Sequence, residues 1–317
     1  MNIKTVPPNS TPKEKKLVQR DTVDSRIAEL PASDTYPKNK LFVATANEPL
    51  GLHYDATEIA AHYQKRPLQV WGRIFAVLAP VISFAWGLWL DSKLGKKVKN
   101  DSRRAVQLRE LLTKLGPAYI KIGQALSTRP DLVPPVYLEE LTKLQDQLPP
   151  FANELAYQFI EEEIGAPPED IYSELTPEPI AAASLGQVYR AKLKSTGEEV
   201  AVKVQRPDLR DRITIDLYIL RKLAAWGQKV IKQVRSDLVG ILDELGERVF
   251  EEMDYVNEGE NAERFFQLYG HMKDVYVPKI YWEYTNRRVL TMEWINGIKL
   301  TQVEEIAALG INARYLV

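Results

Sequence analysis

The chain has 317 residues, enough for about two domains, and its 45% hydrophobic and 27% charged residues are typical of a folded globular protein. Its 42 Lys and Arg balance 43 Asp and Glu, which disfavours a generally basic nucleic-acid-binding protein, so we expect no nucleic acid as a partner. Cysteine is absent and only three histidines occur, which excludes disulfides and cysteine-ligated metals and leaves no histidine spacing typical of a metal site.

Residues 1–66 are predicted to form a disordered or weakly structured tail. Six prolines interrupt this stretch, and charges of both signs alternate along it. A short helix around 56–64 is the one regular element that we expect there. No apolar run follows a basic start, so the stretch does not look like a secretory signal.

Residues 67–99 are predicted to form an apolar helix that contacts a membrane. The 17 residues from Ile74 to Leu90 carry no charge, and tryptophans lie near both ends of this run, at Trp71, Trp86 and Trp89. Arginines and lysines flank the run on both sides, as at a membrane interface. Its length is close to the lower limit for crossing a bilayer, and Pro80 lies in its middle. A spanning helix and a buried helix with a proline kink are the alternatives.

The charges that follow are segregated. Residues 91–129 carry ten Lys and Arg against three acidic residues, whereas residues 138–175 carry ten acidic residues and one Lys. An anionic lipid surface is a natural partner for a basic stretch that follows an apolar one. Alternatively, the two stretches pair with each other or face solvent. Residues 100–176 are expected to be a helical extension of the next domain.

From about residue 177 the pattern favours strands. Two runs of β-forming residues, 187–194 and 199–205, are separated by Ser195-Thr196-Gly197, which predicts a hairpin. Helices are predicted at 213–234 and 237–266. Two further strand candidates lie at 275–284 and 288–294.

A lysine on the second hairpin strand indicates an anion site. In Val200-Ala201-Val202-Lys203, Lys203 shares a face with Ala201 among apolar neighbours, where an unpaired ammonium is costly. The V-A-x-K pattern alone is weak. Its place after a loop of small residues (181–184) and before a carboxylate-bearing helix and two strands is the order found in a protein-kinase N-lobe.

That helix offers carboxylates in two directions. A helical wheel of residues 237–266 points Glu252 into an apolar stripe and places Glu251, Asp254 and Glu258 on the opposite side. The stripe is formed by Leu238, Ile241, Leu242, Leu245, Val249, Met253 and Val256. A carboxylate within a stripe needs a cation, or its pKa rises. A solvated acidic face explains the other three carboxylates but not Glu252.

A second lysine lies upstream on a predicted helix. Lys121 and Gln124 are three residues apart and share a helix face, and Gly123 between them would allow another backbone to approach closely.

Together these residues resemble the UbiB/AarF family of atypical protein-kinase-like proteins. The family's K-x-G-Q motif matches Lys121-Ile122-Gly123-Gln124, and its A-L-S-T-R-P-D-L segment matches 125–132. An alanine-rich loop replaces the kinase glycine-rich loop, here Ala181-Ala182-Ala183-Ser184, and the E-x-D motif is Glu252-Met253-Asp254. The resemblance covers about residues 100–301.

The resemblance implies an ATP site and a regulatory site. The expected ATP-binding residues are Ala181, Ala182, Ala183, Ser184, Val188, Lys203, Glu258, Met292, Glu293 and Ile295. Lys203 should pair with Glu258, and the backbone of 293–295 should hydrogen-bond adenine. Met292 is expected either to guard the back of the pocket or to be a core residue. The regulatory residues are Lys121, Gln124, Glu252 and Asp254, with a Lys121–Glu252 contact. Alanines should hold phosphates differently from glycines, because they disfavour positive φ and crowd the backbone.

The chain also departs from the family pattern. It contains no His-x-Asp and no Asp-Phe-Gly sequence, and it ends at Val317, about where the C-lobe would begin. We therefore expect no catalytic residue in this chain, no ligands for the Mg²⁺ that the family uses, and no phosphate transfer without a partner chain that carries a C-lobe.

The predicted fold is α+β, a kinase-like N-lobe (177–295) of antiparallel sheet plus a carboxylate-bearing helix. A helical extension precedes it and the start of a C-lobe (296–317) follows. The resemblance implies an ATP-binding atypical kinase or ATPase on the cytoplasmic side of a cyanobacterial cell or thylakoid membrane, peripheral or singly anchored, and linked to prenyl-quinone (ubiquinone or plastoquinone-type) biosynthesis. The main alternative is a non-catalytic membrane scaffold or fragment that binds nucleotide or a prenyl lipid. An aminoglycoside-type phosphotransferase is disfavoured by the K-x-G-Q helix.

Overall fold

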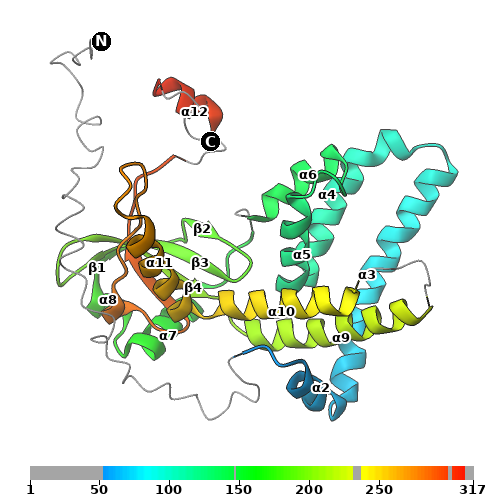
Figure 1. Cartoon of the computed structure of the whole chain (residues 1–317), viewed down its shortest axis with the longest axis horizontal. Helices are drawn as coiled ribbons and strands as arrows, with labels where there is room; N and C mark the ends of the chain where they lie inside the picture. The colour runs from blue at the N-terminus through cyan, green and yellow to red at the C-terminus, as the bar shows by residue number, and fades with distance from the viewer. Residues whose placement is uncertain (1–52, 146–147, 231–236, 299–301, 311–317) are drawn as a thin grey trace. The chain divides into compact units, whose positions relative to one another are not determined.

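The computed structural model describes residues 53–145, 148–230, 237–298 and 302–310, which fall into two units (Figure 1). The described part of the smaller unit is 262–277, the second half of helix α11 (Tyr255–Tyr269) and the turn after it. In it the rings of Phe265 and Tyr269 lie 4.7 Å apart. All other described elements belong to the larger unit.

The larger unit contains an antiparallel sheet in the order β1-β3-β4-β5, with the short β2 pairing with β3. Its strands are β1 (Tyr172–Leu175), β2 (Ala181–Ala182), β3 (Gly186–Leu193), β4 (Glu199–Gln205) and β5 (Val289–Glu293). The predicted hairpin is confirmed as β3–β4, with Gly197 at φ 73° in its turn. The predicted strand at 288–294 is confirmed as β5.

The strand predicted at 275–284 is wrong. Within that stretch the structure has one isolated bridge, from Ile280 to Met292, and a 3₁₀ turn, η3 (Trp282–Tyr284). Pro278 has no N–H to give to a strand ladder, which accounts for the irregular path.

The sheet buries one face against helix α7 (Asn153–Ile164), which is followed by the short α8 (Pro168–Ile171). Ala156 and Ile160 of α7 share a buried cluster with Val200, Val202 and Val204 of β4. Because side chains alternate along a strand, Ala201 and Lys203 lie on the other face of the sheet.

A second core joins three helices: α2 (Ala56–Gln64), α9 (Leu209–Val230) and α10 (Leu238–Met253). Ile59 and Tyr63 of α2 are buried in it, and the Tyr63 hydroxyl lies 2.8 Å from that of Thr214. The short helix at 56–64 is therefore confirmed, but residues 56–64 do not belong to a weakly structured tail. Residues 1–52 of that predicted tail, and 231–234 of the predicted helix 213–234, lie outside the described residues.

The predicted helix at 237–266 is two helices. α10 ends at Met253, Asp254 leaves the helical conformation at φ −97° and ψ 100°, and α11 begins at Tyr255. The predicted stripe is correspondingly only partly right. Val249 and Met253 are buried, but Ile241 is exposed.

Helix α3 (Pro67–Lys93) is the predicted apolar helix, and α4 (Lys97–Leu115) returns beside it. Arg104 of α4 binds Asp91 through Nε at 2.6 Å and the carbonyl oxygen of Gly87 through a terminal nitrogen at 2.8 Å. By length and composition α3 is, among the described residues, the one helix that could cross a membrane, and only 6% of its apolar window is buried. Within the described residues α3 is therefore an exposed helix and not a buried one.

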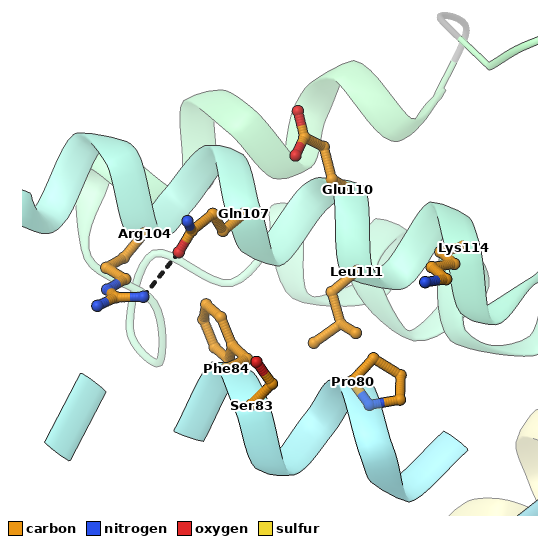
Figure 2. Close-up of a pocket in the computed structure, with 8 residues that line it drawn as sticks. All are labelled: Pro80, Ser83, Phe84, Arg104, Gln107, Glu110, Leu111 and Lys114. Atoms are coloured by element: carbon orange, nitrogen blue, oxygen red, sulfur yellow. Dashed lines mark hydrogen bonds between the residues drawn. The ribbon is translucent and has the colours of Figure 1, made fainter. Parts of the chain in front are cut away.

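An open pocket of about 280 Å³ lies between these two helices (Figure 2). Pro80, Ser83 and Phe84 of α3 form one side of it. The α4 side is formed by Arg104, Gln107, Glu110, Leu111 and Lys114.

The K-x-G-Q motif lies on α5 (Pro117–Ser127), which packs with α6 (Pro135–Thr142) and the 3₁₀ turn η2 (Lys143–Gln145). Pro117 at the first position starts the helix after Gly116, whose φ is 110°. We expected Gly123 to let another backbone approach closely, and that prediction is wrong. A Cβ there would lie 2.5 Å from Cδ1 of Leu144 and 2.9 Å from Cδ1 of Leu112, so the missing side chain makes room for two leucines.

The stretch from residue 296 onward was expected to begin a C-lobe. Its described residues contain helix α12 (Val303–Ala308).

Candidate functional site

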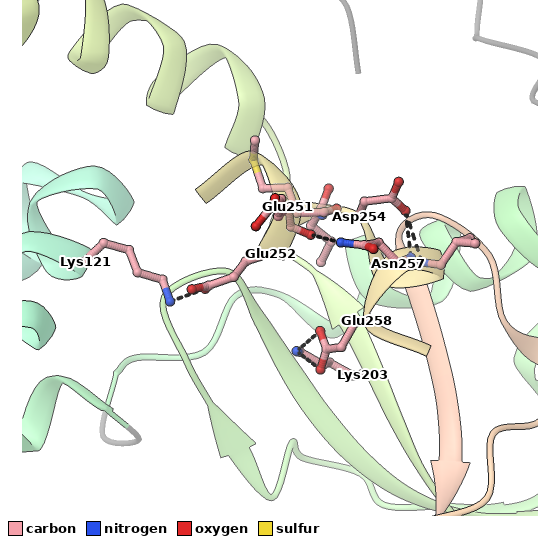
Figure 3. Close-up of polar contacts among 10 residues, drawn as sticks. Lys121, Lys203, Glu251, Glu252, Asp254, Asn257 and Glu258 are labelled. Carbon is pink, nitrogen blue, oxygen red and sulfur yellow. Dashed lines mark hydrogen bonds and ion pairs between the residues drawn. The ribbon is translucent and has the colours of Figure 1, made fainter. Parts of the chain in front are cut away.

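The centre of the candidate site is an ion pair between β4 and α11 (Figure 3). Lys203 Nζ lies 2.7 and 2.6 Å from the two carboxylate oxygens of Glu258. The same nitrogen lies 4.6 Å from the ring centroid of Tyr255. The side chains of Lys203 and Glu258 are partly exposed, so the pair is accessible from solvent. The Lys203–Glu258 contact that the sequence predicted is present.

Local packing fixes this pair. Tyr255, the first residue of α11, is fully buried, and its N–H donates to the carbonyl oxygen of Arg287. A Cβ on Gly186 of β3 would collide with the Tyr255 hydroxyl and with the backbone oxygen of Val204. Burial raises the pKa of the Tyr255 hydroxyl well above its usual value, so this group stays neutral. The start of α11 is therefore held against the face of the sheet that bears Lys203.

A second ion pair joins α5 to the end of α10. Lys121 Nζ contacts Glu252, as predicted (Figure 3). The predicted burial of Glu252 is wrong, because its side chain is 49% exposed whereas that of Lys121 is 18% exposed. The wheel treated Glu252 as the middle of a long helix, but it lies in the last turn of α10.

Asp254 and Gln124 do not join this ion pair in the structure. The Asp254 carboxylate accepts the N–H groups of Val256 at 3.1 Å and Asn257 at 3.4 Å, and thus caps the first turn of α11. Gln124 Nε2 donates to the carbonyl oxygen of Leu144 at 2.8 Å, and so ties α5 to η2.

Part of the backbone of the alanine-rich loop is already hydrogen-bonded within the sheet and to the residues that follow the loop. Ala181 and Ala182 form β2, and the N–H of Ala183 donates to the carbonyl oxygen of Gly186 at 2.8 Å. Ser184 is buried. Val188 lies opposite both Ala181 on β2 and Lys203 on β4, so the structure brings the loop, this valine and the lysine together.

Arg206 and Tyr255 are two residues that the sequence reasoning missed. Arg206 Nε donates to the carbonyl oxygen of Ala183 at 3.0 Å, and another of its nitrogens donates to that of Pro149 at 2.7 Å. Burial lowers the pKa of Arg206. Its place directly after the lysine-bearing strand was the available signal, as was the place of Tyr255 directly after the E-x-D motif.

The predicted adenine-binding edge lies at the end of β5. Half-buried Met292 pairs with Ala201 of β4. The N–H of Glu293 donates to the carbonyl oxygen of Lys279 at 2.8 Å, and that of Trp294 donates to Glu199 at 3.1 Å. Ile295 is exposed, and its N–H has no hydrogen-bond partner within the described parts of the chain. The amide available to a ligand at this edge is therefore that of Ile295.

The residues present fit ATP better than they fit a metal ion. A paired lysine lies on β4, and an exposed amide follows the end of the neighbouring strand β5. Within 53–145, 148–230, 237–298 and 302–310, no group of three or more His, Asp or Glu could hold a metal ion.

Comparison with known proteins identifies relatives. A model of the ABC1 atypical kinase-like domain matches residues 143–317. The chain is 59% identical over 287 residues to an uncharacterised protein of Synechocystis, covering 90% of this chain and 40% of that protein. It is 46% identical over 276 residues to a chloroplastic aarF domain-containing protein kinase of Arabidopsis thaliana, and the match covers 86% of this chain and 40% of that protein. It shares 45% identity over 264 residues with chloroplastic ACTIVITY OF BC1 COMPLEX KINASE 3 of the same plant, and this match covers 83% of this chain and 37% of that protein.

The chain thus spans less than half the length of these relatives. Among solved structures, the complex of Rv3197 with erythromycin from Mycobacterium tuberculosis is similar at 29% identity and a TM-score of 0.42, over 68% of this chain and 53% of that one. The family match covers more than half of the chain and includes its alanine-rich-loop and E-x-D motifs, and the chain therefore belongs to the ABC1 atypical kinase-like family, also called UbiB/AarF.

Proposed function

We propose that this chain is the ATP-binding part of an atypical kinase-like protein. The β3–β4 hairpin, β5 and α11 would correspond to the kinase N-lobe. The observation that supports the proposal best is the two-oxygen contact of Glu258 with Lys203, because kinases use such a pair to present the lysine to the nucleotide phosphates.

The other site residues take roles consistent with their positions. The loop 181–184 would lie over the phosphates, and Val188 would pack on the adenine. Met292 would border the back of the pocket, and the backbone from Glu293 to Ile295 would meet the adenine edge. Mg²⁺ would have to be held by residues outside the described part of this chain, either in a longer form of the protein or in a partner chain.

The Lys121–Glu252 pair would regulate access to this site. It ties α5 to the last turn of α10, and Asp254, two residues further on, caps the helix that carries Glu258. Gln124 would support this arrangement by holding α5 to η2. Loss of the pair would free α5 to move relative to α11.

The first test is ATP binding, measured by thermal shift and by calorimetry with Mg²⁺ on the purified chain. Wild type should bind, and Lys203→Ala should lose binding. Lys192→Ala is the matched control, because Lys192 is on the adjacent strand β3 and its nearest acid is Glu174 at 4.0 Å. A folded wild-type chain that binds no ATP, or a Lys203→Ala variant that binds normally, would contradict the proposal.

A membrane-bound scaffold without catalysis is the second candidate. The exposed apolar side of α3 favours membrane contact, and the pocket beside it suits a lipid with a polar head, such as a prenyl lipid. The cyanobacterial and chloroplastic relatives favour a thylakoid or cyanobacterial cell membrane. The cytoplasmic side of that membrane and a role in prenyl-quinone biosynthesis are part of the proposal and rest on the family resemblance alone. Vesicle binding by a folded chain that binds no ATP would favour this candidate.

A further inference from the structure

Helix α3 exposes a stripe of large apolar residues along its whole length, and Leu88 and Leu90, which are less exposed, lie outside this stripe. At 100° per residue, six large apolar residues fall within about 80° of one another. They are Trp71, Phe75, Leu78, Ile82, Trp86 and Trp89, and all are exposed. Leu68, which is 88% exposed, extends the stripe at its start. The rings of Trp86 and Trp89 stack at 4.8 Å, and those of Trp71 and Phe75 lie 6.1 Å apart.

The opposite side of α3 packs against the protein. Ile74 borders the core of α2, α9 and α10, and Val77 and Val81 pack on Leu115 and Tyr119. The helix thus has an inner side that packs on protein and an outer side, the outer stripe of the seven residues above, that is exposed.

We propose that α3 lies in the plane of an anionic bilayer, with the outer stripe in the lipid, and does not cross the membrane. The proposal rests on the membrane contact in the proposed function and specifies its geometry. An amphipathic helix of this kind inserts about 5–10 Å below the headgroups.

The neighbour of α3 argues against crossing. α4 runs antiparallel beside it, with Arg104 at Gly87 and Asp91, Leu111 near Val77 and Val81, and the Leu115 carbonyl oxygen accepting from Arg73. Eight of the 19 residues of α4 are charged: Lys97, Lys99, Asp101, Arg103, Arg104, Arg109, Glu110 and Lys114. If α3 crossed the bilayer in this arrangement, α4 would enter the hydrocarbon with it.

Two further features indicate that α3 lies at the membrane interface and not in the hydrocarbon core. The pocket between α3 and α4 contains Glu110 and Lys114, which would be unsolvated inside a bilayer (Figure 2). Arg73, in the second turn of α3, binds the buried carboxylate of Asp216 on α9 at 2.7 and 2.8 Å. Both features are compatible with an interface and costly in the hydrocarbon core.

The charges at the end of α3 specify the lipid. Four exposed lysines follow the outer stripe, Lys93, Lys96, Lys97 and Lys99. The one acid among them, Asp91, is buried and paired with Arg104. Tryptophans at both ends and lysines beyond one end are the arrangement expected at an anionic membrane surface.

The test measures depth at three positions on one stripe. Because the chain has no cysteine, single-cysteine variants at Leu68, Phe75 and Ile82 can each carry a nitroxide label. On vesicles of phosphatidylcholine and phosphatidylglycerol, all three labels should lie at one shallow depth by power saturation. A helix that crosses would place successive labels about 10 Å apart in depth, which would overturn the proposal.

A variant that adds charges to the outer stripe tests whether lipid or a second copy of the chain covers it. Phe75→Glu/Ile82→Glu should weaken partition to these vesicles by about tenfold or more, and Leu155→Glu, an exposed leucine on α7, should leave it unchanged. If the wild type ignores vesicles and self-associates, and the double variant makes it monomeric, then a second copy covers the stripe and the proposal is wrong. ATP binding of the double variant keeps the two proposals distinct, because the nucleotide site should be unaffected.

Discussion

Arg73 and Asp216 form a buried ion pair whose loss should be much more costly than that of a surface pair. The side chain of Asp216 is fully buried and receives two hydrogen bonds from Arg73. Removing one partner of such a pair leaves an unpaired buried charge, which typically costs about 3–5 kcal/mol. We therefore expect Arg73→Met to lower the free energy of unfolding by about 3 kcal/mol in urea titrations at pH 7, and exposed Lys96→Met to leave it nearly unchanged.

The pH dependence of that variant follows from the same carboxyl. Burial raises the pKa of Asp216, and Arg73 opposes the rise, so the pKa should rise further without Arg73. A carboxyl whose pKa is higher in the folded state binds more protons there, so stability falls as pH rises through the window between the two pKa values. Arg73→Met should therefore regain stability as the pH falls from 7 to 5. Equal loss at both pH values would contradict a buried charge as the cause.

Comparing alanine substitutions at Gly123 and at Gly72 separates the effect of side-chain packing on stability from the effect of helix propensity. Gly123→Ala would force Leu144 and Leu112 to move, and such overpacking costs about 1–3 kcal/mol, against about 1 kcal/mol gained in helix propensity. Gly72, also in a helix, has nothing within 4 Å of a Cβ, so Gly72→Ala should be neutral or stabilising by up to about 1 kcal/mol. Thermal unfolding of both variants tests this. Equal effects would show that packing at Gly123 is not tight.

Among the elements, the junction of α10 and α11 should control the proposed nucleotide site. Asp254 caps the turn that carries Glu258, and loss of such a cap costs about 1 kcal/mol. Asp254→Ala should therefore weaken ATP binding by up to about fivefold, with a smaller effect on overall unfolding. Asp254→Ser, which keeps a capping oxygen, should bind ATP as the wild type does. If both variants weaken binding equally, then the charge of Asp254 matters and not the cap.

Local signals predicted the elements that depend on local chemistry. The hairpin turn at 195–197 was found because its turn residues are contiguous in the sequence. The break at Asp254 was missed because a helical wheel assumes an unbroken helix, although Asp254 is itself a capping residue. The strand at 275–284 was over-predicted because its β-forming residues were counted without the effect of Pro278.

The contrast between local and distant signals also explains which contacts of the candidate site were predicted and which were missed. The Lys203–Glu258 pair was implied by the family resemblance and is confirmed as a contact, although Glu258 lies on a different helix from the one assumed. Arg206 and Tyr255 were missed because their roles depend on neighbours that are distant in sequence, at Pro149, Ala183 and Gly186. Such contacts follow from how the elements pack, which the sequence pattern does not specify.

At the scale of the whole molecule, nucleotide and membrane should act on different elements, and hydrogen exchange can resolve them. Ligand binding at 100 times its Kd stabilises a folded protein by about 2.7 kcal/mol, enough to slow amide exchange near the site. ATP with Mg²⁺ should slow exchange in β3, β4, β5 and the start of α11, whereas anionic vesicles should slow it in α3 and α4. Lys203→Ala should remove only the first effect, and Phe75→Glu/Ile82→Glu only the second. If ATP instead protects α3 in both variants, then the nucleotide does not bind at Lys203, and the assignment of the site is wrong.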